Sequence, residues 1–183
     1  MESYCSILEE TIASHKLTND VYSDLQALFR CCVATSSEVR RFASDYISTI
    51  VTRFPSLLCE TSVVTFLLEL LTLLRHSVDS HWIDPYTPTY VFSSVRIALQ
   101  ITLTADFRER QQILSTFYLN VRSWLDASIT STPIELQALL QEYIDSTEQA
   151  IFYQQSEMGR SIAMDLMRTS PKGRYLALEQ LFT

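Results

Sequence analysis

The fold class is decided by residues Ser37–Pro55, which read SEVRRFASDYISTIVTRFP. Apolar residues recur there with the 3.6-residue period of a helix, which predicts one continuous stripe facing a core. Ser36 or Ser37 is suited to cap the helix, because a serine hydroxyl accepts a hydrogen bond from a free backbone N–H. Pro55 ends it, because its ring clashes with a continued helix. The stripe is made of Val39, Phe42, Ala43, Tyr46, Ile47, Ile50, Val51 and Phe54.

Similar patterns on both sides predict further helices. The segment Val63–Val78 is apolar on most sides, with Glu69 and Arg75 the main exceptions, and a helix of this kind is buried on all sides. Its longest apolar run, Val63–Leu74, is about 12 residues and contains a glutamate, so we expect no transmembrane segment. The other predicted helices are Tyr4–Ser14, Val21–Val33, Thr104–Ser128, Thr132 to about Gln155, Glu157–Arg168 and Arg174–Phe182.

One segment departs from this pattern. Residues Asp79–Tyr90 read DSHWIDPYTPTY, with two prolines and no helical period, which predicts a long loop. The following residues, Val91–Leu103, fit an alternating strand and a helix about equally, and we expect them to be extended to mixed. The loop's aromatic residues have two interpretations of equal weight: a partner-binding hook or a cover over the core. They are Trp82, Tyr86 and Tyr90.

Composition favours an all-α fold. Glycine occurs only twice in 183 residues, far below the average of about 7%, whereas sheets and hairpins use it often. Apolar residues make up 47% and charged residues 19%, which suggests a surface partly covered by other protein. We therefore predict one helical region over residues 1–183, either an armadillo- or HEAT-like α-solenoid or an irregular antiparallel bundle, as a fragment of a larger solenoid.

The net charge and the cysteine content indicate which kinds of binding partner and which cellular compartment to expect. A net charge of −7 and a pI near 4.9 argue against nucleic acid, because phosphate binding depends on clustered Lys and Arg. The four cysteines have no C-x-x-C spacing and indicate reduced core residues. The first ten residues contain acids and interrupted apolar positions, so they do not resemble a signal peptide. We expect a cytoplasmic protein.

No catalytic, cofactor-binding or metal-ligating residue is predicted. Neither glycine belongs to a phosphate-binding loop. His76 and His81 flank Asp79 and Asp84, an arrangement more typical of ordinary loop polarity than of a metal site. The cysteine pair Cys31–Cys32 falls beside an apolar helix face, where a nucleophile is not expected. The arginines Arg40, Arg41 and Arg53 indicate ion pairing more than an anionic-lipid patch.

The string VRRFASDYISTIVTRFPSLL, Val39–Leu58, closely resembles the type III alpha phosphatidylinositol 4-kinases. The resemblance weakens over residues 79–98 and resumes in ITLTADFRERQQIL (Ile101–Leu114), LQEYI (Leu140–Ile144) and EMGRSIAMDLM (Glu157–Met167). It implies a helical solenoid region N-terminal to the catalytic region, which would use ATP and magnesium outside this chain. It also implies recruitment to the plasma membrane with a TPR-like scaffold protein and a lipidated membrane anchor, and a possible homodimer.

Two hypotheses remain open at this point. The first is a non-catalytic scaffold segment of a phosphatidylinositol 4-kinase that packs against the remainder of the parent protein. The second is an independent armadillo- or HEAT-like adaptor unrelated to lipid kinases. An intrinsically active helical enzyme is disfavoured, because no acid, base or nucleophile stands out.

Overall fold

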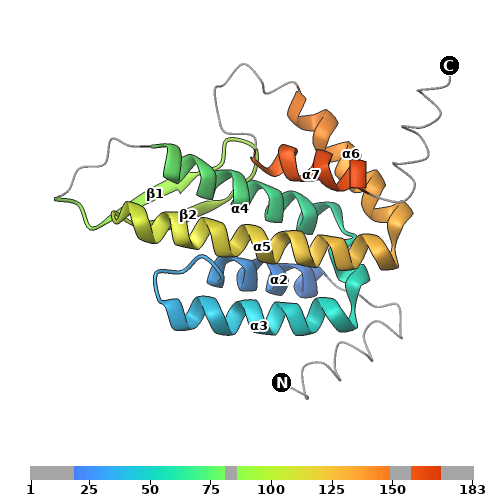
Figure 1. Ribbon diagram of the computed structural model, residues 1–183, viewed down its shortest axis with the longest axis horizontal. Coiled ribbons are helices and arrows are strands. Elements are labelled where there is room, and N and C mark those ends of the chain that lie inside the picture. The colour runs from blue at the N-terminus through green and yellow to red at the C-terminus, as the bar shows by residue number, and fades with distance from the viewer. Residues whose placement is uncertain (1–18, 81–85, 149–157, 170–183) are drawn as a thin grey trace.

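The computed structural model describes residues 19–80, 86–148 and 158–169. Most of these residues are helical, which confirms the all-α prediction (Figure 1). The helices are α2 (Asn19–Cys31), α3 (Ser37–Arg53), α4 (Thr61–Asp79), α5 (Phe107–Ser131), α6 (Pro133–Glu148) and α7 (Met158–Thr169). A 3-10 turn, η1 (Pro55–Leu58), and two strands, β1 (Thr89–Ser93) and β2 (Gln100–Thr104), complete them.

The helices pack as successive antiparallel pairs. Helix α2 contacts α3, α4 contacts α5, and α6 contacts α7. Contacts between pairs form two layers, α2–α4–α7 and α3–α5–α6 (Figure 1). The pairs therefore stack side by side along one direction.

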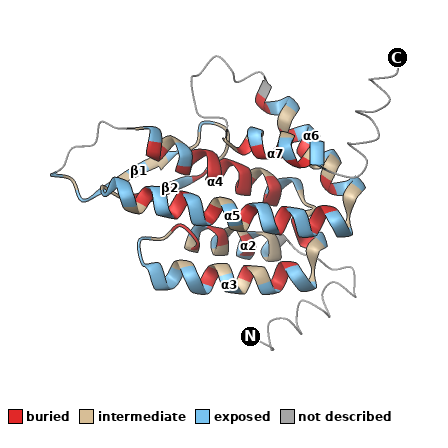
Figure 2. Ribbon diagram, in the orientation of Figure 1, coloured by how far each residue is buried: buried red, intermediate tan, exposed pale blue. Residues whose placement is uncertain are grey.

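Helix α4 is the centre of the core, as its sequence predicted. Residues Phe66 to Leu74 are all buried, including Glu69 (Figure 2). Contrary to the expectation from its shorter apolar run, α4 is long and apolar enough to cross a membrane by length and composition. However, 72% of the qualifying window is buried inside the fold, as in the core helix of a soluble domain.

Helix α3 has the predicted bounds but only part of the predicted stripe faces the core. The Ser36 hydroxyl accepts a hydrogen bond from Val39 N, and Pro55 follows the helix, as expected. Ile47 and Ile50 are fully buried and Tyr46 and Phe54 are half-buried, whereas Val39 is 42% and Phe42 64% exposed. At about 100° per residue, Phe42 lies about 140° around the axis from Ile47. The prediction for Val39 and Phe42 was therefore wrong, because only the part of the stripe formed by Ala43, Ile47, Ile50 and Val51 is buried.

An antiparallel hairpin joins α4 to α5. Its register pairs Thr89 with Thr104 and Val91 with Thr102. Ile101 and Leu103 are buried, while Thr89, Val91 and Ser93 are exposed, so one face of the hairpin covers the helices. The extended interpretation of residues 91–103 is thus correct, and the predicted long loop is shorter, because α4 reaches Asp79 and β1 begins at Thr89.

Several predictions fall outside the described residues. These are the helices Tyr4–Ser14 and Arg174–Phe182, the end of α6 beyond Glu148, and the side chains of Trp82 and His81.

Candidate interaction surface

The turn of the hairpin is held by a buried carboxylate on α4. Glu69 is only 3% exposed, and its two oxygens accept three hydrogen bonds from side chains. Ser94 Oγ donates over 2.8 Å, Arg96 Nη1 over 2.9 Å as an ion pair, and the Tyr143 hydroxyl over 2.8 Å. Burial, followed by the negative charge of Glu69, raises the pKa of Tyr143. This Glu69 cluster therefore ties the hairpin and α6 to α4.

Helix α7 approaches α4 closely beside this cluster. The Gly159 N–H donates to Thr72 Oγ1 over 3.0 Å, and Thr72 in turn donates to the Leu68 carbonyl over 3.0 Å. A Cβ at Gly159 would meet Leu68 O at 2.5 Å and the Tyr143 hydroxyl at 2.8 Å. Only glycine allows this separation of the two helices, so this position fixes where α7 docks.

A buried arginine holds the base of the hairpin. Arg110 on α5 is 1% exposed, and its guanidinium donates to three backbone carbonyls. Nε bonds Ser77 O over 3.1 Å, and Nη1 bonds Thr104 O and Ala105 O over 2.9 and 2.7 Å. Desolvation lowers the pKa of Arg110, while Asp106 and Tyr90 oppose that effect. The carbonyl dipoles compensate the buried charge and join the end of α4 to the end of β2.

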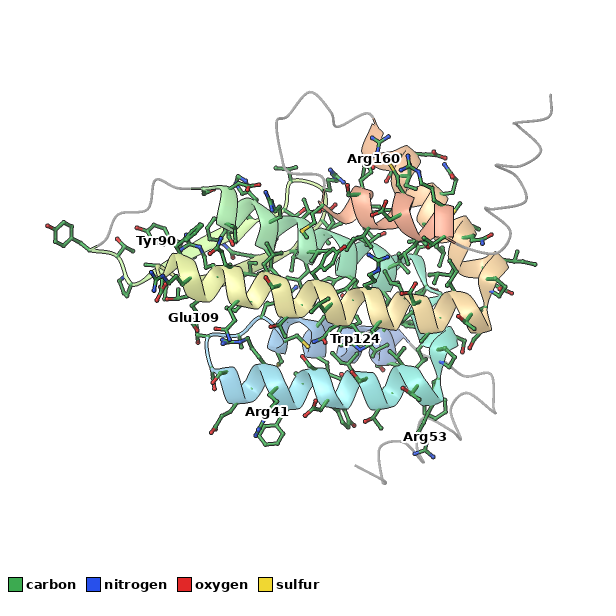
Figure 3. The ribbon with its side chains drawn as sticks, in the orientation of Figure 1. Arg41, Arg53, Tyr90, Glu109, Trp124 and Arg160 are labelled. Carbon is green, nitrogen blue, oxygen red and sulfur yellow. The ribbon has the colours of Figure 1, made fainter. Side chains whose placement is uncertain are left out.

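Two of the three residues of the predicted aromatic hook, Tyr86 and Tyr90, lie in the part of the chain that the structure describes. Tyr90 is half-buried within β1 (Figure 3). Tyr86, which precedes β1, is 92% exposed. Trp82 lies outside the described residues. Exposed aromatic surface occurs at Tyr86, and the hook itself stays a prediction.

The outer side of α3 offers a second exposed surface. Arg41 stacks over the Phe42 ring with 5.1 Å between its guanidinium carbon and the ring centroid. Arg41 and Arg53 both point away from the body of the protein at this side (Figure 3). A groove of about 290 Å³ runs between α3 and α5, lined by Arg40, Arg41, Asp45, Gln112, Thr116 and Asn120 among others. A large aromatic ring beside a cation is a typical anchor for protein contacts.

Of the three arginines on α3, Arg40 forms an ion pair with Glu109, whereas Arg41 and Arg53 lie over aromatic rings. Arg40 Nη1 donates to Ala34 O and Thr35 O over 2.7 Å each and lies 3.4 Å from Glu109 Oε1. The Arg53 guanidinium lies over the Phe54 ring, 5.9 Å from its centroid. Arg40 therefore caps the end of the α2 turn and links it to α5.

The three cysteines that the structure describes are free thiols, Cys32 buried and Cys31 and Cys59 half-buried. Among residues 19–80, 86–148 and 158–169, no three His, Cys, Asp or Glu side chains gather as metal ligands would. Burial raises the pKa of the Cys32 thiol to about 12, with Cys31 adding to this and a hydrogen bond from Ser44 opposing it. Burial also raises the pKa of Cys59, whose Sγ lies 2.9 Å from Thr132 Oγ1. Thiols with raised pKa values are poor nucleophiles at neutral pH.

The sequence did not predict the buried polar contacts that hold the hairpin against the helices. Glu69 was visible as a charge in an otherwise apolar helix, a pattern that requires buried partners. The partners themselves, Arg96 and Tyr143, are 27 and 74 residues away and carry no local signal. Arg110 was likewise hidden, because an arginine on a helix is ordinarily exposed.

Comparison with known proteins identifies relatives of the whole region. The model of a family described as PI4-kinase N-terminal region matches residues 2–166. A curated relative, phosphatidylinositol 4-kinase stt4 of Schizosaccharomyces pombe, is 25% identical over 161 residues. That alignment covers 88% of this chain and 9% of the relative, so the chain spans a small part of the length of the protein it matches.

Proposed function

The chain belongs to the PI4-kinase N-terminal region family, and we propose on that basis that it is a non-catalytic helical scaffold segment of a phosphatidylinositol 4-kinase. The observation that carries the proposal is the alignment itself, because 88% of the chain matches 9% of a protein named as a lipid kinase. Such a segment contributes packing surface to a much larger protein, whose kinase chemistry resides elsewhere.

The arrangement of the helices supports a solenoid role. Each antiparallel pair buries one side against the next pair, and this is how stacked helical repeats propagate. At the α3 end the stack presents Phe42 at 64% exposure with Arg41 over its ring. We propose that this end packs against the remainder of the parent kinase, where such a residue would be covered.

The proposal extends to cofactors, partners and location. ATP and magnesium would bind the catalytic region, outside residues 1–183. A TPR-like scaffold protein and a lipidated membrane anchor would recruit the assembled kinase from the cytoplasm to the plasma membrane, where it would make phosphatidylinositol 4-phosphate, and the kinase would be able to dimerise. The helical segment would serve this recruitment through docking surfaces and would not insert into the bilayer.

The first test concerns chemistry in the chain alone. Purified residues 1–183 are titrated with ATP and magnesium in a calorimeter and assayed for phosphorylation of phosphatidylinositol in mixed micelles. We expect neither binding nor turnover. Saturable ATP binding at micromolar concentration would contradict the non-catalytic role.

The second test concerns the parent protein. The transcript is sequenced beyond the codon for Thr183, and we expect a lipid-kinase catalytic sequence in the same reading frame. A stop codon there would favour the independent adaptor. In the full-length protein, Phe42→Asp should preserve the fold of this region but weaken its packing against the remainder of the kinase. Limited proteolysis should then cleave this region from the remainder of the kinase faster than in the wild type. The matched control is Ser115→Asp, an exposed position on α5 that lies beside α4 and away from the outer side of α3.

A further inference from the structure

The backbone of the hairpin has two edges, and the hydrogen bonds at its ends show which groups point to each. Ala105 N donates to Pro88 O over 2.9 Å, and Ser94 N donates to Leu99 O over 2.9 Å. Hydrogen-bonded pairs alternate along an antiparallel ladder, so residues 90 and 92 bond to β2. The N–H and C=O groups of Thr89, Val91 and Ser93 therefore point outward on the β1 edge, and those of Gln100, Thr102 and Thr104 on the β2 edge.

The β2 edge is covered by arginines. Arg110 Nη1 donates to Thr104 O over 2.9 Å, and Arg30 Nη1 from α2 donates to Gln100 O over 3.4 Å. These contacts confirm the orientation of the two carbonyls. They also leave little room for another strand on this side, since α5 packs against β2 and the Arg30 side chain from α2 reaches Gln100.

The β1 edge is open across the part of the chain that the structure describes. The outward backbone groups of Thr89, Val91 and Ser93 have no hydrogen-bond partner among these residues, and all three residues are exposed, Val91 to 55%. Natural edge strands are usually blocked by lysine or another charge, by proline or by a bulge. The β1 sequence TYVFS contains no lysine, no other charged residue and no proline, so its edge is suited to accept a strand.

We propose that the β1 edge binds an extended segment of a partner polypeptide by adding it as a third strand, with Thr89, Val91 and Ser93 supplying the backbone hydrogen bonds. Unpaired backbone groups at a sheet edge select an extended strand over a helix or a lipid. The partner segment would be uncharged and rich in β-branched residues. Charged side chains at the hairpin turn and at the end of α4 are already paired, Arg96 with Glu69 and Arg75 with Asp79. This inference does not depend on the kinase assignment.

The test uses a peptide of known pairing ability. The eight-residue peptide ALQITLTA copies Ala98–Ala105, whose central residues already pair with β1 in an antiparallel register. It is titrated into the 183-residue chain while amide hydrogen exchange is followed by NMR. We expect slower exchange at the outward amides of Thr89, Val91 and Ser93. A peptide that displaced β2 would protect only Tyr90 and Phe92, as β2 already does, so slower exchange at the outward amides separates edge addition from displacement of β2.

Two proline variants form a matched pair. Val91→Pro removes one outward N–H on the β1 edge, a position where proline is tolerated because its nitrogen faces away from the ladder. Thr102→Pro makes the same change directly opposite, on the covered β2 edge. We expect Val91→Pro to weaken peptide binding at least tenfold and Thr102→Pro to leave it unchanged. Val91→Lys, which keeps the N–H but adds charge, should also weaken binding and serves if the proline variant does not fold.

Three outcomes would overturn the proposal. The first is an absence of protection at Val91 with millimolar peptide. The second is equal loss of binding in both proline variants. The third is protection that depends on the concentration of the chain alone, because a second copy would then be the occupant in place of a partner segment.

Discussion

Replacing Gly159 with alanine should destabilise the protein, although alanine is the better helix former. At an unconstrained helical position the change would stabilise by up to about 1 kcal/mol. Here the added Cβ would lie 2.5 Å from Leu68 O, whereas 3.0 Å is about the closest approach such carbons make, so α7 must withdraw by at least the difference, 0.5 Å. The contacted atom is a backbone carbonyl in the middle of α4, which has little freedom to move.

The magnitude follows from two effects. Forcing a methyl group into a packed contact typically costs about 1–3 kcal/mol. A withdrawal of α7 also stretches the 3.0 Å hydrogen bond from Gly159 N to Thr72 Oγ1, and an unsatisfied buried N–H costs about 1–3 kcal/mol. Since the methyl group also recovers part of the helix propensity, we expect a net loss of roughly 1–4 kcal/mol.

Urea denaturation of the 183-residue chain, followed by circular dichroism, measures this loss. At this chain length 1 kcal/mol corresponds to roughly 2–4 °C in Tm, so a thermal melt provides a second readout. Ser161→Ala is the matched control, because Ser161 lies on the same helix but is exposed, and it should change stability little. An alanine variant at Gly159 as stable as the wild type would refute the close approach of α7 and α4.

Three other perturbations test different parts of the fold. Ile47→Asp should lower the free energy of unfolding by several kcal/mol, because it buries an unpaired charge. Phe42→Asp, on the exposed flank of the same helix, should change that free energy by no more than about 0.5 kcal/mol in the isolated chain. Equal losses for the two variants would contradict the observed buried face of α3. Glu69→Ala should lower the free energy of unfolding in a urea melt by about 3–5 kcal/mol, because it leaves Arg96 without its acceptor. Glu69→Gln keeps an amide oxygen and should lower it less. A larger loss for Glu69→Gln than for Glu69→Ala would contradict the Glu69 cluster. Burial raises the pKa of the Cys32 thiol from 9.0 to about 12, so the unfolded chain loses this proton at lower pH than the folded protein. The free energy of unfolding should therefore fall as pH rises from 9 toward 12. Cys32→Ala should show a shallower decline, and identical pH profiles for the two proteins would argue against a buried thiol.

Local signals predicted the helix boundaries well. The bounds of α3 follow from a capping serine and a proline, which act within one turn of the helix ends. The face of α3 was less predictable, because its apolar stripe is wider than its contact surface. Ala43, a small residue, is buried, while the larger Phe42 beside it is not. Which flank is covered depends on α2 and α5, and no residue of α3 specifies that.

The hairpin and its anchors lay beyond local prediction. Its turn, Ser94–Leu99, contains neither glycine nor an Asn-Gly pair, which are the usual hairpin signals. Hydrogen bonds with distant elements hold the hairpin instead, at its turn with Glu69 on α4 and at its base with Arg110 on α5. The candidate strand-binding edge depends on this register, since a shift of one residue would turn different backbone groups outward.

The Glu69 cluster also has a consequence for the order in which the chain folds. Its donors lie 25, 27 and 74 residues from Glu69 in the sequence. Contacts between residues close in sequence form faster, because less chain entropy is lost in closing the loop. Ser94 and Arg96 can therefore neutralise the carboxylate before α6 arrives with Tyr143. During synthesis from the N-terminus, α4 would have a compensated buried charge once the hairpin has emerged, and α6 and α7 would complete a core that is already electrically balanced.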